Sequence, residues 1–475
     1  MRALVVEDDR AFADELARIL RERLRHPPSH IAFAQSRDSA YSYLDQEFFD
    51  LLLLDLKIPT VDGALDADPR HGLAVFGRAR QIAPGTPIFV LTGSPAEDFI
   101  PDLLAGQQHV DIWGEGRKVG TVEFLKKYRF DEAPAKLEPI ADAVWALSEV
   151  ELDRGDTDLG LEDDRLVRIF ARRVGGTRCV AKMIGGGLSN AKVIRLKVTD
   201  VQGAPVYDAV AKLGSIAEVR DESERFETHV ARLDPATTPR KLQTLEFGAK
   251  AQAAVFYGLA DGFNLDGFGV CLRPEDLFCS VPTILSEATR RWREGIAETR
   301  RSVREIRRRL ISDEDFQRVT KPHNILWLND FESRQIQTHW GCVHGDLHGG
   351  NVLVSEDGTC VLIDYGDVGE GPASLDGITL EFSLLFHPKG PLRTGGWPAP
   401  GQASQWANLD QYLIGCPAAG FIAACRGWAN EVAAGQREVA ASAYSYLVRQ
   451  FKYVDTDKNL VLELLEAVHT WFMST

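Results

Sequence analysis

The chain has 475 residues, which is more than one compact core usually organises, so we expect two or three domains. Its net charge of −15 disfavours general binding to nucleic acid, because the average field would repel the phosphates. No stretch approaches the roughly 20 apolar residues that span a bilayer, and the start, MRALVVEDD, lacks the basic and apolar segments of an export signal, so we predict a cytoplasmic protein with no membrane partner.

Short apolar runs alternate with helical patterns over residues 1–148. The apolar runs are ALVV at 3–6, HIAFA at 30–34, LLLLDL at 51–56, PIFVLT at 87–92 and VEFLK at 122–126. The helical patterns cover 11–24, 39–46, 71–82, 98–106 and 136–150. This alternation indicates right-handed crossovers and a parallel sheet covered on both faces. We therefore predict an α/β, doubly wound domain with five parallel strands.

The composition changes at residues 149–164, where ELDRGDTDLGLEDD is acidic and has no apolar periodicity, so we predict a solvated linker. Residues 165–262 then contain a strand, a glycine loop, two further strands, an acidic helix and two more strands, which predicts a small antiparallel sheet with one helix. Residues 263–475 are dominated by helical patterns, apart from short strands around NVLVS and CVLID. We predict a larger, mostly helical lobe there.

Three acids end predicted strands of the N-terminal domain: Glu7 and Asp8 follow ALVV, and Asp55 follows LLLL. The carboxyl ends of parallel strands form the ligand-binding edge of a sheet, so these side chains could converge. Three carboxylates suit Mg²⁺, which would neutralise Asp55 and let it attack a phosphoryl group. Thr92, which ends PIFVLT, could hydrogen-bond the phosphoryl oxygens, and Lys127 could pair with them.

This ordered set resembles the receiver domain of two-component response regulators, over about the first 148 residues. The resemblance implies that Asp55 is the phosphoacceptor, that Glu7 and Asp8 complete the metal site, and that Thr92 and Lys127 form the switch pair. It also implies a histidine kinase as phosphodonor, and it is compatible with a dimer.

Two segments depart from the receiver pattern as insertions, at 63–72 and at 109–120. In addition, Tyr128 stands where the family usually has proline, so Lys126 is an alternative to Lys127 as the functional lysine.

The most specific pattern of the chain is HGDLHGGN at 344–351, followed by IDYGD at 363–367. Phosphoryl transfer needs a base near the acceptor hydroxyl and metal ligands on the nucleotide phosphates. Asp346 lies in a loop before a strand and Asn351 follows five residues later, so one side chain can face the acceptor and the other Mg²⁺. Asp364 ends the next strand, where it can bind the same metal.

Nucleotide-binding candidates lie upstream. GGGLSNA at 185–191 lies between two strands and can place backbone N–H groups over phosphates, since glycine permits close backbone approach. Lys212 is the candidate phosphate lysine, held by Glu222 or alternatively by Glu224. The strand QAAVFYGLA would form the adenine-binding hinge. The predicted nucleotide contacts are Gly185, Gly186, Gly187, Ser189, Lys212, Tyr257 and Leu259.

Residues 165–475 resemble the aminoglycoside-phosphotransferase and choline-kinase branch of the protein-kinase-like fold, on HGDLHGGN and IDYGD. They also look like the kinase-like domains called ternary-complex-associated. The resemblance implies an α+β, bilobal domain that uses ATP and Mg²⁺, with Asp346 as catalytic base, Asn351 and Asp364 as magnesium ligands, and His344 as organiser of the loop. Later acids such as Asp376 and Glu381 would support the fold.

Nine arginines fall between residues 290 and 309, with glutamates at spacings that favour ion pairs along a helix. We predict a solvated helix there, and the alternative is a surface for an anionic acceptor or partner.

The main functional hypothesis is a two-component signalling enzyme, in which phosphorylation of Asp55 regulates ATP-dependent phosphate transfer to an unknown protein or small-molecule hydroxyl. The first alternative is a catalytically inactive kinase-like adaptor, because fold alone does not determine function. The second is a small-molecule phosphotransferase of the aminoglycoside type, which the fused receiver disfavours.

Overall fold

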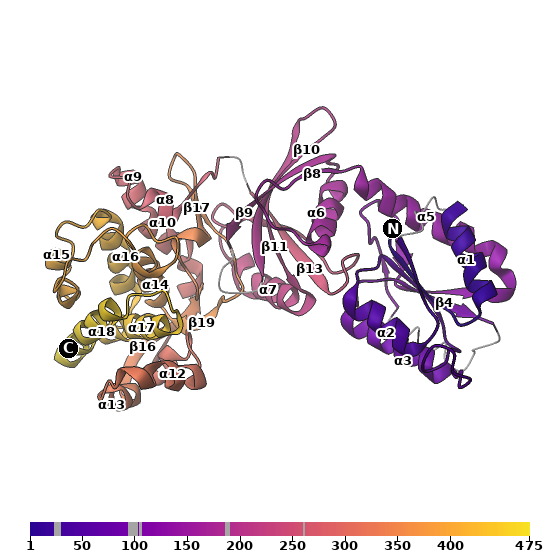
Figure 1. The fold of residues 1–475 in the computed structure, drawn as a ribbon. Helices are drawn as coiled ribbons and strands as arrows, with labels where there is room; N and C mark the ends of the chain where they lie inside the picture. The colour runs from indigo at the N-terminus through magenta and orange to yellow at the C-terminus, as the bar shows by residue number, and fades with distance from the viewer. Residues whose placement is uncertain (23–29, 94–102, 104–106, 186–190, 260–261) are drawn as a thin grey trace. The chain divides into compact units, whose positions relative to one another are not determined.

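The computed structural model describes residues 1–22, 30–93, 103, 107–185, 191–259 and 262–475. It forms two compact units (Figure 1). Unit 1 contains residues 1–219 and 241–258, and unit 2 contains residues 220–240 and 259–475. The predicted boundary near residue 262 lies close to the division between the units, whereas the predicted boundary after residue 148 falls inside unit 1.

The first part of unit 1 is the predicted five-stranded parallel sheet, in the strand order β2-β1-β3-β4-β7. All neighbouring pairs are parallel. The strands are β1 (Ala3–Val6), β2 (Ile31–Ala34), β3 (Leu51–Asp55), β4 (Ile88–Thr92) and β7 (Val122–Lys126). The central strands β1 and β3 are buried along their whole length, as expected for a parallel sheet covered on both faces.

Helices cover both faces of this sheet (Figure 1). They are α1 (Arg10–Glu22), α2 (Arg37–Gln46), α3 (Pro69–Ile82) and α5 (Ala133–Ser148). Alternate strand residues point to opposite faces, so Leu52 and Leu54 pack with α2 and α3, while Leu51 and Leu53 pack with α1 and α5. The helix predicted at 98–106 lies outside the described residues except for Leu103.

The predicted insertion at 109–120 is a two-stranded antiparallel hairpin, β5 (His109–Val110) with β6 (Val119–Gly120). Its tip carries Ile112 and Trp113, which are both 1% exposed. Gly114 lies against helix α6 (Leu161–Arg173), where an added Cβ would come 2.8 Å from the carbonyl oxygen of Ile169. This insertion therefore joins the receiver to the part of the chain that follows it.

The second part of unit 1 is a six-stranded sheet in the order β12-β13-β11-β10-β9-β8. Its strands are β8 (Glu151–Asp153), β9 (Arg178–Gly185), β10 (Lys192–Thr199), β11 (Pro205–Ser215), β12 (Arg240–Leu245) and β13 (Gln252–Leu259). Helix α7 (Ile216–His229) follows β11. The predicted linker at 149–164 contains β8, which pairs in parallel with β9, and the first turn of α6. It is mostly exposed, yet it forms part of the sheet.

The two sheets of unit 1 share one hydrophobic core, which runs from Met1 and Val5 to Phe170 and Phe256. Arg165 on α6 pairs with the buried carboxylate of Asp50 at 3.0 Å. The backbone also joins them, because the amide of Gly85 donates to the carbonyl of Lys250 at 3.0 Å and the carbonyl of Gly85 accepts from the amide of Gly248 at 2.9 Å. The domain of the five-stranded sheet is thus packed on the six-stranded sheet as one body.

Unit 2 contains two three-stranded sheets, with orders β14-β17-β18 and β15-β16-β19. Their strands are β14 (Leu265–Asp266), β15 (Ala297–Ser302), β16 (Gln335–Val343), β17 (Val352–Val354), β18 (Cys360–Leu362) and β19 (Gly369–Pro372). The sequence predicted only two of these strands, β17 and β18. Strands β15, β16 and β19 pair with strands that lie far away in the sequence. Their own residues therefore give little local indication that a strand will form.

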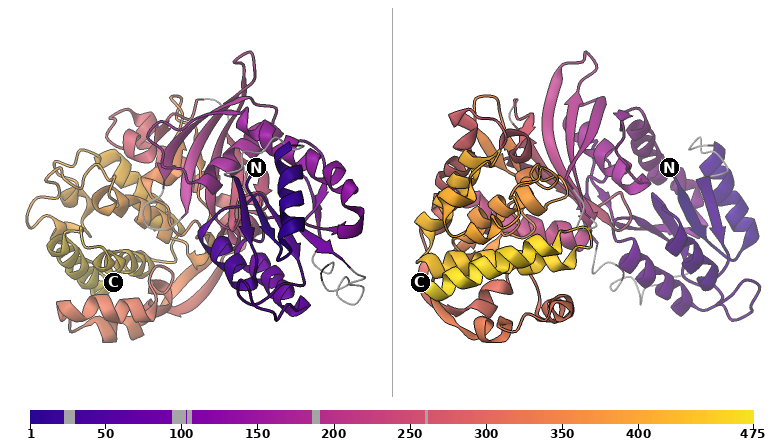
Figure 2. Two further views of the ribbon diagram at one scale, coloured as in Figure 1. Left: turned by 45° about the vertical axis from the view of Figure 1, so that its right-hand side comes forward. Right: turned by 60° about the vertical axis from the view of Figure 1, so that its left-hand side comes forward.

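Helices make up most of the rest of unit 2. They are α8 (Gly267–Val270), α9 (Asp276–Cys279), α10 (Val281–Ala288), α11 (Val303–Arg307), α12 (Asp313–Thr320), α13 (Leu328–Ser333), α14 (Leu375–Phe386), α15 (Leu409–Tyr412), α16 (Ala419–Val432), α17 (Gln436–Arg449) and α18 (Lys458–Ser474). Every residue of α14 is buried. The yellow helices of Figure 2, α17 and α18, lie side by side. No helix in the described part of the chain combines the length and apolarity that crossing a membrane requires.

The arginine-rich segment is not the predicted helix. Arg300 and Arg301 lie in β15, which pairs with β16, and only the end of the segment enters α11. The prediction was wrong because the glutamate spacing is compatible with a helix, whereas pairing with β16 decides the conformation. Arg307 is 1% exposed and pairs with the buried Glu332 at 2.8 Å, so this arginine is structural.

Candidate functional site

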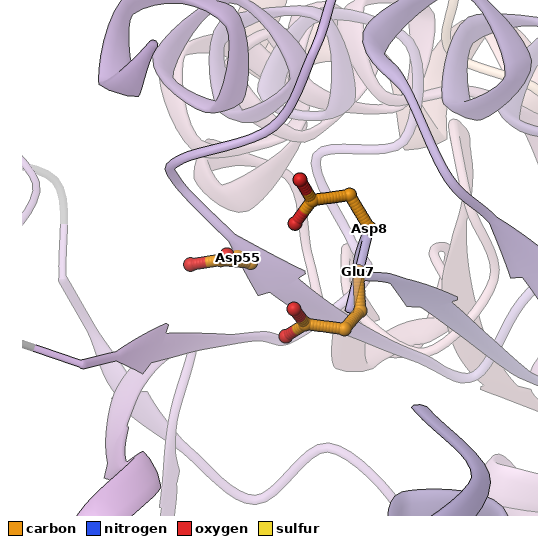
Figure 3. Close-up of side chains that lie close together, drawn as sticks. All are labelled: Glu7, Asp8 and Asp55. Carbon is orange, nitrogen blue, oxygen red and sulfur yellow. The ribbon is translucent and has the colours of Figure 1, made fainter. Parts of the chain in front are cut away.

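The acidic cluster of the receiver lies at the carboxyl edge of its sheet (Figure 3). Glu7 and Asp8 come directly after β1, and Asp55 is the last residue of the neighbouring β3. Ligand oxygens of the three side chains lie within 4.8 Å of one another. Glu7 and Asp55 are buried, and Asp8 is exposed. The predicted convergence of these three carboxylates is thus present in the structure.

The close approach of these carboxylates changes their acidity. Burial and the neighbouring charge of Asp55 raise the pKa of Glu7 to about 7. Burial also raises the pKa of Asp55, although the charge of Lys127 opposes the change. Because the pKa values of these two buried acids are raised, a bound cation would strongly stabilise their ionised forms.

Lys127, and not Lys126, reaches this cluster. The Nζ atom of Lys127 lies 2.7 Å from Oε2 of Glu7 and 2.9 Å from Oδ2 of Asp55. Lys126 is exposed, and its Nζ lies 5.7 Å from the centre of the Tyr128 ring. In the sheet register Lys126 is opposite Thr92, which ends β4 beside the cluster. The geometry therefore favours the Lys127 assignment over the alternative.

The residues of the cluster fit Mg²⁺, which prefers a few carboxylate oxygens and retains water. Glu7, Asp8 and Asp55 would supply these oxygens. With its pKa at about 7, Glu7 holds a proton below neutral pH that a bound metal would have to displace.

We expect Mg²⁺ to raise the Tm of the protein, with a half-saturating concentration that is about 30-fold higher at pH 5.5 than at pH 8, because Glu7 must lose its proton first. Thermal unfolding followed by tryptophan fluorescence during Mg²⁺ titrations at the two pH values measures this shift. Glu7→Gln should remove most of the pH dependence, while Glu47→Gln, which lies elsewhere on the receiver, should retain it. Equal midpoints at both pH values in the wild type would contradict the expectation.

The second site is the loop between β16 and β17 together with the end of β18. Asn351 directly precedes β17, and Ile363 and Asp364 directly follow β18. The amide of Ile363 donates to the carbonyl of Asn351 at 3.0 Å, so the ends of the two paired strands are held together. The Asn351 side chain donates from Nδ2 to the carbonyl of Asp346 at 2.9 Å. Asp346, Asn351 and Asp364 therefore lie in segments that hydrogen bonds hold together at one end of the β17–β18 pair.

The side-chain oxygen of Asn351 accepts no hydrogen bond from any residue that the structure describes, so it can serve as a metal ligand. Asp364 has a φ of 66°, in the left-handed region that is uncommon for residues other than glycine. Strained backbone of this kind gathers at functional sites. An amide oxygen and a carboxylate form a hard donor set that fits Mg²⁺.

Buried residues around the loop, among them His344 and Asp376, make hydrogen bonds with its backbone. The amides of His344 and Gly345 donate to the carboxylate of Asp376, at 2.7 and 3.0 Å. The ring of His344 contacts the carbonyl of Ile363 through Nε2 at 3.1 Å. His344 thus connects the loop before β17 with the segment after β18.

The sequence did not predict the partner of Asp346. Nη1 of Arg449, the last residue of α17, lies 3.1 Å from Oδ1 of Asp346. Burial acts to raise the pKa of Asp346, but the charges of Arg449 and His348 outweigh it, and the pKa is lowered. Asp346 is therefore ionised at neutral pH, which a proton acceptor requires.

The nucleotide candidates of unit 1 lie on neighbouring strands. Gly185 ends β9 and Lys212 lies in β11, and both are opposite Val193 of β10 in the register. Gly186, Gly187 and Ser189 lie outside the described residues. Tyr257 is buried in β13, and Leu259 ends that strand.

Lys212 has an acidic neighbour that the sequence did not suggest. Hydrogen bonds from Ser215 lower the pKa of Glu218, and the charge of Lys212 acts in the same direction. Of the two acids that were predicted, Glu222 is 1% exposed and Glu224 is exposed. Burial raises the pKa of Tyr365, and the charge of Glu222 adds to this, so Glu222 lies near the segment that follows Asp364. Glu222 as the partner of Lys212 stays a prediction.

Comparisons with known proteins recognise two regions. Residues 3–109 match the model described as "Response regulator receiver domain", and residues 264–397 match the one described as "Phosphotransferase enzyme family". A response regulator receiver protein from Anaeromyxobacter sp. strain Fw109-5 is 32% identical over 97 residues, 20% of this chain and 35% of that protein. CpdR, a response regulator receiver protein from Brucella abortus strain 2308, is 32% identical over 101 residues, 21% of this chain and 73% of that protein. The chain thus spans about a third of the first relative.

Solved structures resemble the chain at low identity. One is a ternary complex of the aminoglycoside phosphotransferase APH(4)-Ia with ADP and hygromycin B, with 12% identity, 62% of this chain and 93% of that chain covered, and a TM-score of 0.34. Another is a choline/ethanolamine kinase family protein from Mesorhizobium loti, with 12% identity, 62% and 88% covered, and a TM-score of 0.33.

Proposed function

Because this chain belongs to the response regulator receiver family through its N-terminal region and carries a phosphotransferase-family domain in its C-terminal region, we propose that it is a signalling phosphotransferase. A histidine kinase would phosphorylate Asp55, and the state of Asp55 would regulate Mg²⁺-dependent transfer of the γ-phosphate of ATP to a hydroxyl acceptor. The observation that carries the enzymatic part is the hydrogen-bonded strand end that gathers Asp346, Asn351 and Asp364.

In this proposal Asp346 accepts the proton of the acceptor hydroxyl while the acceptor oxygen forms its bond to the γ-phosphorus. Asn351 and Asp364 would hold Mg²⁺, which neutralises the charge of the phosphates. Lys212 would bind phosphate oxygens, and His344 would keep the loop in its geometry through its contacts with Asp376 and Ile363. The ionised state of Asp346 supports its role, because only a carboxylate can take the proton.

Regulation has a physical route inside unit 1. Lys127 contacts Asp55 and begins the short 3₁₀ segment Lys127–Glu132, which leads directly into α5. Helix α5 packs on α6, and Arg172 of α6 donates to the carbonyl of Ala143 in α5 at 2.8 Å. A phosphoryl group on Asp55 would draw Lys127 away from Glu7, so the start of α5 would respond to phosphorylation.

We expect a phosphodonor to change the rate of ADP formation by the protein by about 5-fold or more, the lower end of usual coupling free energies. The measurement compares rates with and without acetyl phosphate in the wild type and in Asp55→Asn, which should not respond. Asp45→Asn is the matched control, since this exposed receiver acid pairs with Arg78 and should leave the response intact. Wild-type rates that stay the same with and without acetyl phosphate would contradict the regulatory part alone.

A further inference from the structure

Asp346 lies next to an arginine and to a pair of histidines whose pKa values are lowered by burial. Arg449 touches it, and His348 lies 3.9 Å away on its other carboxylate oxygen. A second histidine, His387, lies beside His348 with the rings tilted and their centres 4.4 Å apart, and burial lowers its pKa to about 3, so it is neutral at neutral pH. An acceptor hydroxyl that reaches Asp346 therefore comes close to the permanent positive charge of Arg449.

Arg449 is a built part of this region and not a solvated surface arginine. Its side chain is 17% exposed. Its Nε donates to the hydroxyl of Tyr453 at 3.1 Å, and its Nη1 donates to Asp346. The third nitrogen, Nη2, has no hydrogen-bond partner among the residues that the structure describes. A guanidinium held by two bonds at fixed positions thus keeps one amino group for a further acceptor atom.

Two tyrosines lie near Arg449. Tyr446, one turn earlier on α17, is 6% exposed and stacks on Phe382 with ring centres 5.6 Å apart. The hydroxyl of Tyr453, in the segment that follows α17, accepts from Nε of the guanidinium. The bonds to Tyr453 and Asp346 hold the guanidinium of Arg449 in place, and a planar guanidinium held in this way is suited to carboxylate or phosphate oxygens.

We propose that Arg449 binds an anionic group of the acceptor, a carboxylate or a phosphate, and thereby presents a hydroxyl of the same molecule to Asp346. This inference rests on the proposed phosphotransferase function and names its substrate class. Polycationic acceptors such as aminoglycosides are excluded by it, because they would place positive charge beside a permanently charged, largely buried arginine.

Three small compounds with a primary hydroxyl and different charge test this inference: glycerol phosphate, glycerol and choline. Their binding to the full-length protein in the presence of Mg²⁺ and ADP is measured by ligand-observed NMR, which requires no turnover. We expect glycerol phosphate to bind at least tenfold more tightly than glycerol, and choline not to bind. Arg449→Met should weaken glycerol phosphate by about 10²-fold, as expected for loss of a charged hydrogen-bonded partner.

Arg437→Met is the matched control. Arg437 lies on the same helix and is exposed, with its guanidinium 5.5 Å from the ring centre of Phe472, so the variant removes the same charge far from Asp346. It should bind glycerol phosphate like the wild type. Choline binding more tightly than glycerol phosphate, no binding of glycerol phosphate, or equal weakening in both variants would each overturn the inference.

The failure of this inference is distinct from the failure of the proposed function. ADP formation from ATP, with water as the acceptor, reports the transferase activity whether or not any of the three compounds binds. If Arg449 only orients Asp346, Arg449→Met will lower this hydrolysis and leave the affinity for glycerol phosphate unchanged, and the anchoring role would then be dropped.

Discussion

Replacing Asp346 by asparagine is expected to lower ATP-dependent phosphate transfer by about 10²- to 10⁴-fold, the usual contribution of a positioned proton acceptor. Asparagine has nearly the same shape, and its side-chain oxygen can still accept the hydrogen bond from Arg449, which spans 3.1 Å in the wild type. The amide cannot take the proton of the acceptor hydroxyl. The loss should therefore appear in kcat, with little change in the KM for ATP.

Transfer of radiolabelled γ-phosphate to proteins and small metabolites, together with ADP formation, measures this effect. Asp367→Asn is a suitable control because Asp367 lies three residues after Asp364 and is exposed. It should retain wild-type rates. If the wild type bound ATP and turned over none, the non-catalytic adaptor would be the better description. If Asp346→Asn kept more than half of the rate, Asp346 would not be the proton acceptor.

The second large effect concerns a buried ion pair in the helices that support the loop of Asp346. Glu381 on α14 and Arg426 on α16 are 0% and 3% exposed in their side chains and lie 2.6 Å apart. Glu381 also accepts from the indole Nε1 of Trp406 at 2.9 Å. Helix α14 carries Asp376, which holds the amides of His344 and Gly345, so this pair stabilises the helix that positions the loop.

Arg426→Met should lower the free energy of unfolding of unit 2 by about 3–5 kcal/mol, because it leaves the Glu381 carboxylate buried without a counter-charge. Urea unfolding followed by tryptophan fluorescence measures this change. The double variant Arg426→Met with Glu381→Leu should recover much of the loss, since both buried charges are then gone.

Arg334→Met provides the comparison with an exposed pair. Arg334 and Asp330 lie 2.7 Å apart with side chains 41% and 71% exposed, so this substitution should cost about 0–1 kcal/mol. An Arg426→Met variant as stable as Arg334→Met would show that the buried pair contributes little.

The local patterns of the receiver were sufficient to predict its fold and its acidic cluster. Alternation of buried strands with amphipathic helices is a property of short segments, and the right-handed crossover then leaves one strand order as the usual outcome. Asp55 lies at the end of β3 and Glu7 follows β1, so the parallel sheet itself brings them to one edge. The predicted sheet and the family resemblance are confirmed.

Local sequence patterns did not predict the strands whose pairing partners are distant in the chain. The arginines at 297–302 carry glutamate spacings that suit a helix, yet β15 forms because β16 provides hydrogen-bond partners more than thirty residues later. The acidic linker similarly contains β8, which forms because β9 accepts it as a parallel neighbour. Strand formation depends on such neighbours more than on the strand's own residues.

The sequence by itself determined which residues meet at the proposed second site, because HGDLHGGN and IDYGD flank one β-hairpin and therefore lie together at the end of β17 and β18. The tertiary structure decided which cations face them. It distinguished Lys127 from Lys126 as the lysine that contacts Glu7, and it brought Arg449 to Asp346 across 103 residues. Arg449, one of 54 basic residues, has no periodic signature that marks it as the partner of Asp346, since its position follows from how helices and sheets pack.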